Sequence, residues 1–175
     1  MRMLNRREAL RGIAATALSA RIVFAAVPAH AGAWVVDTKS GCQVWNPNPQ
    51  LEESVAWSGP CVNGRAEGRG IMQWSKSGSP SETDEGQWHD GRQANKGTQS
   101  WSTGRYEGEL SNGEPSGYGV LTVQKLRYEG DFRNGKPNGV GALTAGSETV
   151  RGIWKDGCLQ GQRKASIGIP LSACR

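Results

Sequence analysis

The chain has 175 residues, including 25 glycines and four cysteines, and its formal net charge is +5. This length has room for one domain and a leader, and excludes a repeat array attached to a separate catalytic domain. Five arginines and one glutamate precede residue 32, so the remainder has 16 basic and 15 acidic residues, a near-neutral balance that argues against nucleic-acid binding.

Residues 1–31 have the pattern of a signal peptide. The pair Arg6-Arg7 precedes a small-residue apolar stretch over 12–27, and Ala29-His30-Ala31 offers a cleavage site. The apolar run is too short for a bilayer and Arg21 interrupts it, so we expect cleavage rather than a membrane anchor. The arginine pair resembles a twin-arginine leader, and general secretion is the alternative. Either route predicts a periplasmic or secreted protein, exported across the inner membrane.

Residues 55–160 consist of about five repeats of one motif, between an N-terminal cap segment at 32–54 and a C-terminal cap segment at 161–175. In each repeat two glycines lie five residues apart, and an Asn or Asp precedes the second. The last four repeats are spaced by 22 residues and the first by 27, which is typical of short stacked units. We number these units one to five. Their structural glycines are Gly59 and Gly64, Gly86 and Gly91, Gly108 and Gly113, Gly130 and Gly135, and Gly152 and Gly157.

Each unit has the pattern of a β-hairpin. Around the first glycine, aromatic residues such as Tyr128 and Phe132 alternate with charged ones, which predicts a half-buried strand. The glycine lies on the apolar face, where its missing side chain would admit an aromatic ring from the neighbouring unit. The following Asn-Gly or Asp-Gly predicts a reverse turn. Because a single hairpin is marginal in water, the units should stack into one elongated antiparallel sheet, an all-β fold.

Aromatic residues recur at equivalent positions of the units. In the simpler interpretation they pack hairpin against hairpin, because aligned aromatic residues stabilise sheets. In the other interpretation, part of the set is exposed in a groove and binds a partner. Trp74 and Trp101, which end the return strands of units one and two, form a candidate secondary patch. The candidate binding residues of the main set are Trp57, Trp88, Tyr106, Tyr128, Phe132 and Trp154.

Four cysteines in an exported domain predict disulfides. They allow three pairings. We favour Cys42 with Cys61 and Cys158 with Cys174, because each pair lies at one end of the repeat array and would staple a terminal unit. The sequence leaves the connectivity open.

Neither a metal site, a cofactor nor a catalytic residue is predicted. The chain has no Cys-x-x-Cys, and His89 is the single histidine after the leader. The Gly-x-Gly sequences precede no helix pattern and no Walker lysine, so they do not indicate nucleotide binding. Carboxylates such as Glu107 and Glu129 recur by register on a polar strand face, which predicts solvated groups rather than a catalytic cleft.

The units resemble the MORN repeat, whose pattern runs Tyr-Glu-Gly-x-aromatic-x-Asn-Gly-x-x-x-Gly-x-Gly. Units three and four carry it from Tyr106 to Gly119 and from Tyr128 to Gly141, and the resemblance covers residues 55–159. The segment 42–70 also looks like exported bacterial MORN proteins. The resemblance implies a meander of β-hairpins in one extended, curved sheet. It also implies protein association, scaffolding, self-association or, in some members, lipid contact, and no catalysis by the repeats themselves.

We therefore expect a non-enzymatic protein that acts as a protein-binding or scaffolding module in the bacterial envelope. The expected partner is an envelope protein, and an uncapped sheet edge would also allow self-association. One alternative is a periplasmic immunity or inhibitor protein against a toxin or hydrolase. Another is binding of cell-wall glycan or lipid through an aromatic groove, although the near-neutral charge argues against lipid. Stable membrane insertion is not expected.

Overall fold

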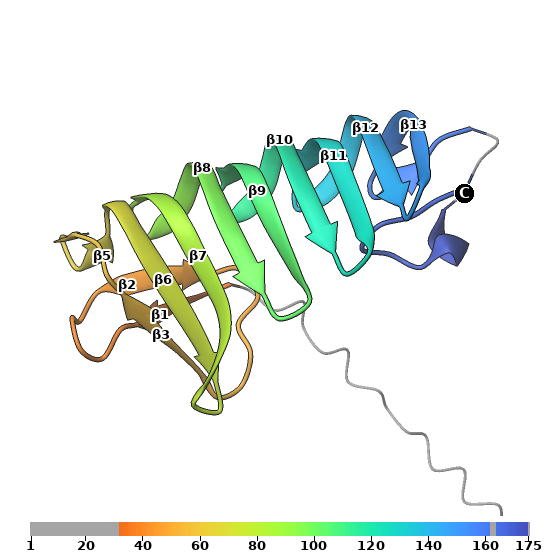
Figure 1. Cartoon of the computed structure of the whole chain (residues 1–175). Helices are drawn as coiled ribbons and strands as arrows, with labels where there is room; N and C mark the ends of the chain where they lie inside the picture. Colours follow the sequence, from red (N-terminus) through yellow and green to blue (C-terminus); the bar gives the residue numbers. More distant parts are fainter. Residues whose placement is uncertain (1–31, 162–163, 175) are drawn as a thin grey trace, which may run out of the picture.

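The computed structural model describes residues 32–161 and 164–174, which form two β-sheets (Figure 1). The signal-peptide prediction for residues 1–31 lies outside these residues. The large sheet has ten strands, and strands that follow one another in its repeats are neighbours in the sheet. Its strands are β3 (Glu53–Trp57), β6 (Gly68–Lys76), β7 (Ser79–His89), β8 (Arg92–Trp101), β9 (Gly104–Ser111), β10 (Glu114–Val123), β11 (Leu126–Arg133), β12 (Lys136–Ala145), β13 (Glu148–Lys155) and β14 (Cys158–Leu159).

The large sheet is the predicted elongated array of hairpins, and Figure 1 shows its curvature. A row of eight glycines, one on each strand from β6 to β13, crosses it. These glycines are directly opposite one another in the antiparallel pairing. The glycine row consists of Gly70, Gly86, Gly97, Gly108, Gly119, Gly130, Gly141 and Gly152.

Tyrosine rings occupy the space that the four glycines of units three and four leave empty. A Cβ atom at Gly119 would lie 2.6 Å from Cε2 of Tyr106, and a Cβ at Gly141 would lie 2.6 Å from Cε2 of Tyr128. The prediction that glycine makes room for a ring is thus confirmed. The ring comes from the same unit, however, and the predicted origin in the neighbouring unit was wrong, because the tyrosine leans along its own hairpin over both glycines.

The Asn-Gly and Asp-Gly turns join each unit to the one before it. Both residues of all five turns have positive φ, the conformation that Asn, Asp and Gly adopt most readily. The amide of Gly113 donates to the carbonyl of Gln93 at 2.9 Å, and the amide of Gly135 donates to the carbonyl of Pro115 at 3.0 Å. The same bond recurs from Gly91 and Gly157. The turns of units two to five are therefore each fixed on the previous unit, which stacks the hairpins.

A second sheet of four strands adds to the single sheet that the sequence predicted. It contains β1 (Ala33–Val36), β2 (Gln43–Asn46), β4 (Cys61–Val62) and β5 (Arg65–Ala66). The turn of unit one, Asn63-Gly64, joins β4 to β5, so this unit is divided between the sheets instead of forming one plain hairpin. The reason is its attachment to β2, through the amide of Gln43, which donates to the carbonyl of Gly64 at 2.8 Å, and through a disulfide.

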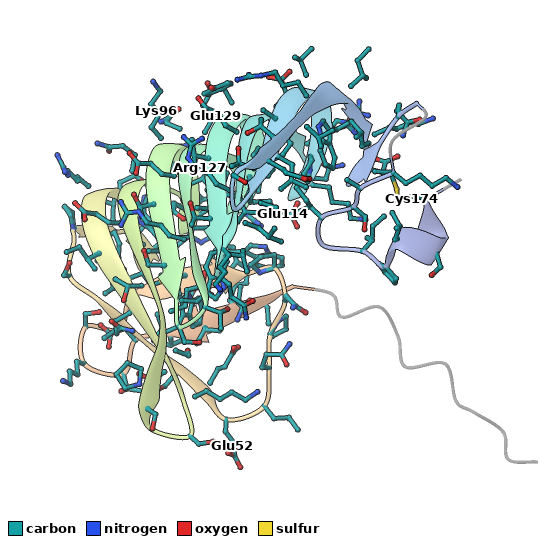
Figure 2. All side chains as sticks on the ribbon, turned by 45° about the vertical axis from the view of Figure 1, so that its right-hand side comes forward. Glu52, Lys96, Glu114, Arg127, Glu129 and Cys174 are labelled. Carbon is teal, nitrogen blue, oxygen red and sulfur yellow. A yellow bond between two sulfur atoms is a disulfide. The ribbon has the colours of Figure 1, made fainter. Side chains whose placement is uncertain are left out.

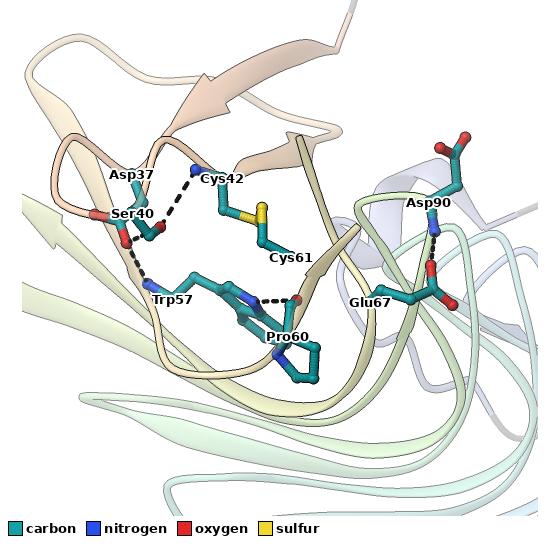
Figure 3. Close-up of a disulfide and its surroundings, with 8 residues drawn as sticks. All are labelled: Asp37, Ser40, Cys42, Trp57, Pro60, Cys61, Glu67 and Asp90. Atoms are coloured by element: carbon teal, nitrogen blue, oxygen red, sulfur yellow. Dashed lines mark hydrogen bonds between the residues drawn. A yellow bond between two sulfur atoms is a disulfide. The ribbon is translucent and has the colours of Figure 1, made fainter. Parts of the chain in front are cut away.

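Both favoured disulfides are present. Cys42–Cys61 lies within the small sheet, and Cys158–Cys174 ties the C-terminal segment, residues 164–174, to β14. Close to the first disulfide, the buried carboxylate of Asp37 accepts hydrogen bonds from Ser40 Oγ at 2.6 Å and from the amide of Trp57 at 3.3 Å (Figure 3). These donors lower the pKa of Asp37, with the bond from Ser40 contributing most. The cap segment is thereby fixed to the first strand of the array.

The small sheet and the C-terminal segment cover opposite ends of one face of the large sheet, which we call the inner face. Two hydrophobic clusters fill the space beneath them. The first joins Val44 of the small sheet to Trp57, Met72 and Trp88. The second joins Tyr106, Tyr128, Phe132, Trp154 and Leu159, with Ala165 and Ile167 packed against it. The opposite, outer face bears the charged residues of the strands.

Candidate binding surfaces on the inner face

The main set of aromatic residues lies in the core. Each of the six is at most 7% exposed. Edge-to-face contacts with ring centroids 5.1 Å apart join Trp57 to Trp88, and join Tyr106, Phe132, Tyr128 and Trp154 in sequence. The hydroxyl of Tyr106 donates to the carbonyl of Glu109 at 2.7 Å. The six side chains therefore expose very little surface to a partner, which corrects the interpretation that this set as a whole forms the binding groove.

The two residues of the secondary patch have different surroundings. Trp74 is buried, and its indole N–H donates to Oδ2 of Asp84 at 3.1 Å. Trp101 is half-buried and packs at the margin of the second hydrophobic cluster. The structure therefore does not bring Trp74 and Trp101 together as one patch, and only Trp101 offers surface on the inner face.

Trp101 lines an apolar groove on the uncovered part of the inner face, with a volume of about 370 Å³. Leu126, at its rim, is 44% exposed, and Leu121 and Leu143 are half-buried. One end of the groove is closed by the C-terminal segment, whose Ile167 packs on the second cluster. The residues that line this apolar groove are Trp101, Leu121, Val123, Leu126, Tyr128, Leu143, Ser166, Ile167 and Gly168.

A second cavity lies where unit two departs from the repeat. Asp84 occupies the position of Tyr106 and Tyr128 in the later units, and Gln99 occupies the position of Leu121. Gln93, which is buried, fills the space above the glycine row in place of a tyrosine ring, since a Cβ at Gly97 would lie 2.6 Å from its Nε2. These polar side chains separate the two hydrophobic clusters of the core.

The loop that follows β2 covers these polar residues and completes a cavity of about 310 Å³. On its walls, Nδ2 of Asn46 and the amide of Gln50 each donate to Oε2 of Glu53 at 2.8 Å. We call it the acidic cavity, after its three carboxyl groups. The residues that define it are Trp45, Asn46, Glu53, Met72, Trp74, Glu82, Asp84, Trp88, Gln93 and Gln99.

Burial changes the ionisation of two of these carboxyl groups. Desolvation raises the pKa of Asp84 well above its usual range, and the nearby Glu82 raises it further. Desolvation also raises the pKa of Glu82, and the charge of Glu53 adds to this effect. Both carboxyl groups therefore keep their protons to a higher pH than free ones.

The carboxylates of the outer face are solvated, as predicted. Arg127 Nη1 donates to Glu129 Oε2 at 2.5 Å, and the two side chains project from the sheet in Figure 2. Arg105 pairs with Glu107 at 3.3 Å. These pairs are exposed and alternate in sign, so the outer face has no single charge that would select an anionic or cationic partner.

An aromatic cluster in the small sheet was not anticipated. The rings of Trp34 and Trp45 meet edge to face at 5.2 Å, with the Arg65 and Arg92 guanidinium groups each 4.2 Å from a ring centroid. The acidic cavity was also missed, although Asp84 in the place of a tyrosine was a signal for it. Among residues 32–161 and 164–174, no set of three His, Cys, Asp or Glu side chains is arranged to hold a metal ion. Nor does any helix there have the length and apolarity to cross a membrane.

An open sheet of stacked hairpins, with a row of glycines beneath its aromatic core, defines a hairpin-repeat protein. Comparison with protein families matches the MORN repeat at residues 62–79, 85–104, 106–122 and 128–148. The chain therefore contains four repeats of the MORN family, whose repeats commonly bind proteins or membranes and are generally non-enzymatic. Comparison with curated proteins finds no match.

Proposed function

We propose that this protein is a non-enzymatic protein-binding module of the bacterial envelope, and that its apolar groove holds an extended apolar segment of a partner protein. The observation that supports this proposal is the groove itself. Its half-exposed apolar side chains lie between two covered regions of the same face, and no charged residue lines it. An apolar patch bordered by polar surface is typical of a protein interface.

The C-terminal segment illustrates the kind of occupant that suits this face. The amide of Ile167 donates to the carbonyl of Gly157 at 2.9 Å, and the amide of Leu159 donates to the carbonyl of Ala165 at 3.0 Å. Alternate residues Ala165 and Ile167 then point into the second hydrophobic cluster. A partner segment with the same alternation would continue this packing along the groove.

Export is part of the proposal. Two disulfides and the predicted leader at residues 1–31 support an oxidising compartment such as the periplasm. The partner would then be an envelope protein. The binding role needs no catalytic group, and the acidic cavity lies apart from the residues that line the groove.

The test is affinity capture from envelope extract with the disulfide-bonded protein as bait, followed by site-specific photo-crosslinking. Trp101→Ala removes the largest ring of the groove and should weaken capture of the partner by about ten-fold or more. Tyr118→Ala is the matched control, because Tyr118 is 51% exposed on the outer face.

The crosslinking locates the contact. A photoreactive residue at position 126, on the rim of the groove, should crosslink the partner, whereas one at position 140, where Val140 is 69% exposed on the outer face, should not. A partner that is lost with Tyr118→Ala and retained with Trp101→Ala would contradict the proposed surface. The absence of any captured envelope protein, with a folded bait, would contradict the adaptor function.

A further inference from the structure

The acidic cavity combines three carboxyl groups with an unusual lack of counter-charge. Glu53, Glu82 and Asp84 line it, and its other lining residues include no Lys, Arg or His. The nearby guanidinium of Arg92 stacks instead on the rings of Trp34 and Trp45. Negative charge enclosed without a cation is costly, and a bound cation would remove that cost.

Two buried polar atoms on the cavity residues have no partner in the described part of the chain. They are Oδ1 of Asp84, which accepts from no N–H or hydroxyl group, and Nε1 of Trp88. Each of these residues is only 3% exposed. Buried polar groups in proteins are nearly always hydrogen-bonded, so such a pair indicates a missing partner with one donor and one acceptor.

The rest of the wall suits an organic ligand. Trp45, Trp74, Trp88 and Met72 contribute apolar surface, and indole rings attract ammonium groups. The amides of Gln93 and Gln99 add polar groups to the same wall. A volume of about 310 Å³ lies at the lower end of the range for small-molecule sites. A divalent metal ion would require oxygen ligands on several sides, and the aromatic walls do not supply them.

We propose that the acidic cavity binds a small hydroxylated primary amine, of the amino-sugar or amino-alcohol class. The ammonium group would donate to Asp84 and Glu82, and a neighbouring hydroxyl oxygen would accept from the Trp88 indole N–H. This site is distinct from the apolar groove, so it adds a ligand-binding function to the proposed protein-binding one. It arises because unit two replaces the tyrosine and leucine of the repeat by Asp84 and Gln99.

Titration calorimetry with the full chain tests the proposal, with D-glucosamine as the probe and D-glucose as its neutral counterpart of nearly equal shape. D-glucosamine should bind saturably and D-glucose should not. Glu82→Gln and Asp84→Asn should each weaken D-glucosamine by about ten-fold or more, the loss expected when one buried charge partner is removed. Glu85→Gln is the matched control, because Glu85 follows Asp84 on the same strand and is exposed on the outer face.

A second measurement leaves the carboxyl groups intact and so does not depend on the folding of those variants. The indole N–H signals of the seven tryptophans are followed by nuclear magnetic resonance, and Trp88→Phe identifies the signal of Trp88. D-glucosamine should shift the signals of Trp88 and Trp74 and leave that of Trp101 unchanged. Equal binding of D-glucose, absence of D-glucosamine binding, an equal loss in Glu85→Gln, or shifts confined to other tryptophans would each overturn the proposal.

Discussion

A single position, residue 84, determines much of the difference between unit two and its neighbours. In units three and four the equivalent tyrosines cover the glycine row, and their hydroxyls donate to backbone carbonyls, that of Tyr128 to Asp131 at 3.2 Å. Burial raises the pKa of Tyr128 to about 12, so this hydroxyl stays protonated at neutral pH. Asp84 in the same place brings a carboxyl group into the core. The consequence is an ionisable group whose charged form is disfavoured by folding.

The pH dependence of stability should reveal this penalty. The folded pKa of Asp84 lies above its ordinary value of 3.8, so the unfolded chain ionises first as pH rises. Below pH 3.8 Asp84 is protonated in both the folded and the unfolded chain, and its ionisation costs the folded state nothing. As pH rises from 3.8 toward the folded pKa, only the unfolded chain ionises, so the free energy of unfolding falls. Asp84→Asn removes the ionisation and keeps an acceptor for Trp74. We expect this variant to be about 1–3 kcal/mol more stable than the natural chain at neutral pH.

Urea unfolding between about pH 4 and 7 measures this difference, because all other titrating groups are shared by the two proteins. The two stabilities should converge toward the acid end and separate toward neutrality. Glu85→Gln, whose carboxyl group is exposed, should follow the natural chain throughout. Parallel curves for Asp84→Asn and the natural chain would show that Asp84 ionises in the folded protein as it does in the unfolded one.

At the scale of the hairpin, a glycine and a ring form the repeating contact. In units three and four the ring is a tyrosine, and in unit five, where Val150 stands in its place, Cδ1 of Leu159 approaches Gly152 instead. The contact is tight because the ring lies against backbone, and neither partner can move away without breaking strand pairing. The same substitution along the glycine row should therefore have unequal effects.

Gly141→Ala should destabilise the protein by about 3 kcal/mol, because the added methyl group would overlap the Tyr128 ring. Gly152→Ala meets the end of a flexible leucine, 2.7 Å from the new Cβ, and should cost about 1 kcal/mol or less. Neither glycine has positive φ, so backbone strain does not enter the comparison. Thermal and urea unfolding of both variants measure the difference. Equal losses of stability in the two variants would mean that the Tyr128 ring moves to accept a methyl group. The row of glycines would then not be explained by contact with rings.

The hairpins were predictable because each unit contains both the strand pattern and the turn residues that form its hairpin. Period-two alternation around Gly130 and the Asn134-Gly135 turn lie within one 22-residue repeat and recur four more times. The small sheet was not predictable in this way, since β2 joins the turns of two units through single contacts, such as the amide of Trp45 with the carbonyl of Gly91. The acidic cavity needs both sheets. Asp84 indicated an irregular unit, but its surroundings depend on the N-terminal segment that covers it, and the sequence of that segment has no repeat that would predict its position.

Which face of the array would be exposed also lay beyond the sequence. Alternation separates Tyr128 from Glu129, and it does not show that residues 32–50 and 164–174 cover the tyrosine side. Those covers bury the main aromatic set and leave Trp101 partly uncovered between them. A groove therefore exists on the predicted face, but of the residues first proposed only Tyr128 and Trp101 line it.

In the whole molecule, each end of the array is closed by a segment and a disulfide. The small sheet covers units one and two, and the C-terminal segment covers the end of the second cluster, held by Cys158–Cys174. The segment is short, and much of it is exposed. Its own packing is therefore modest, and the disulfide should be essential to hold it on the inner face.

Replacing both Cys158 and Cys174 by serine should lower the free energy of unfolding by about 3 kcal/mol, the loop-closure value for a separation of 16 residues. Release of the segment should also uncover Ile167 and the end of the apolar groove, so binding of an apolar fluorescent dye under native conditions should increase. The matched variant lacks Cys42 and Cys61, and it should lose stability without opening the groove, because that bridge lies within the small sheet. Unchanged dye binding in the first variant would mean that Ala165 and Ile167 hold the segment by packing alone, and the groove would then keep its present length whatever the redox state.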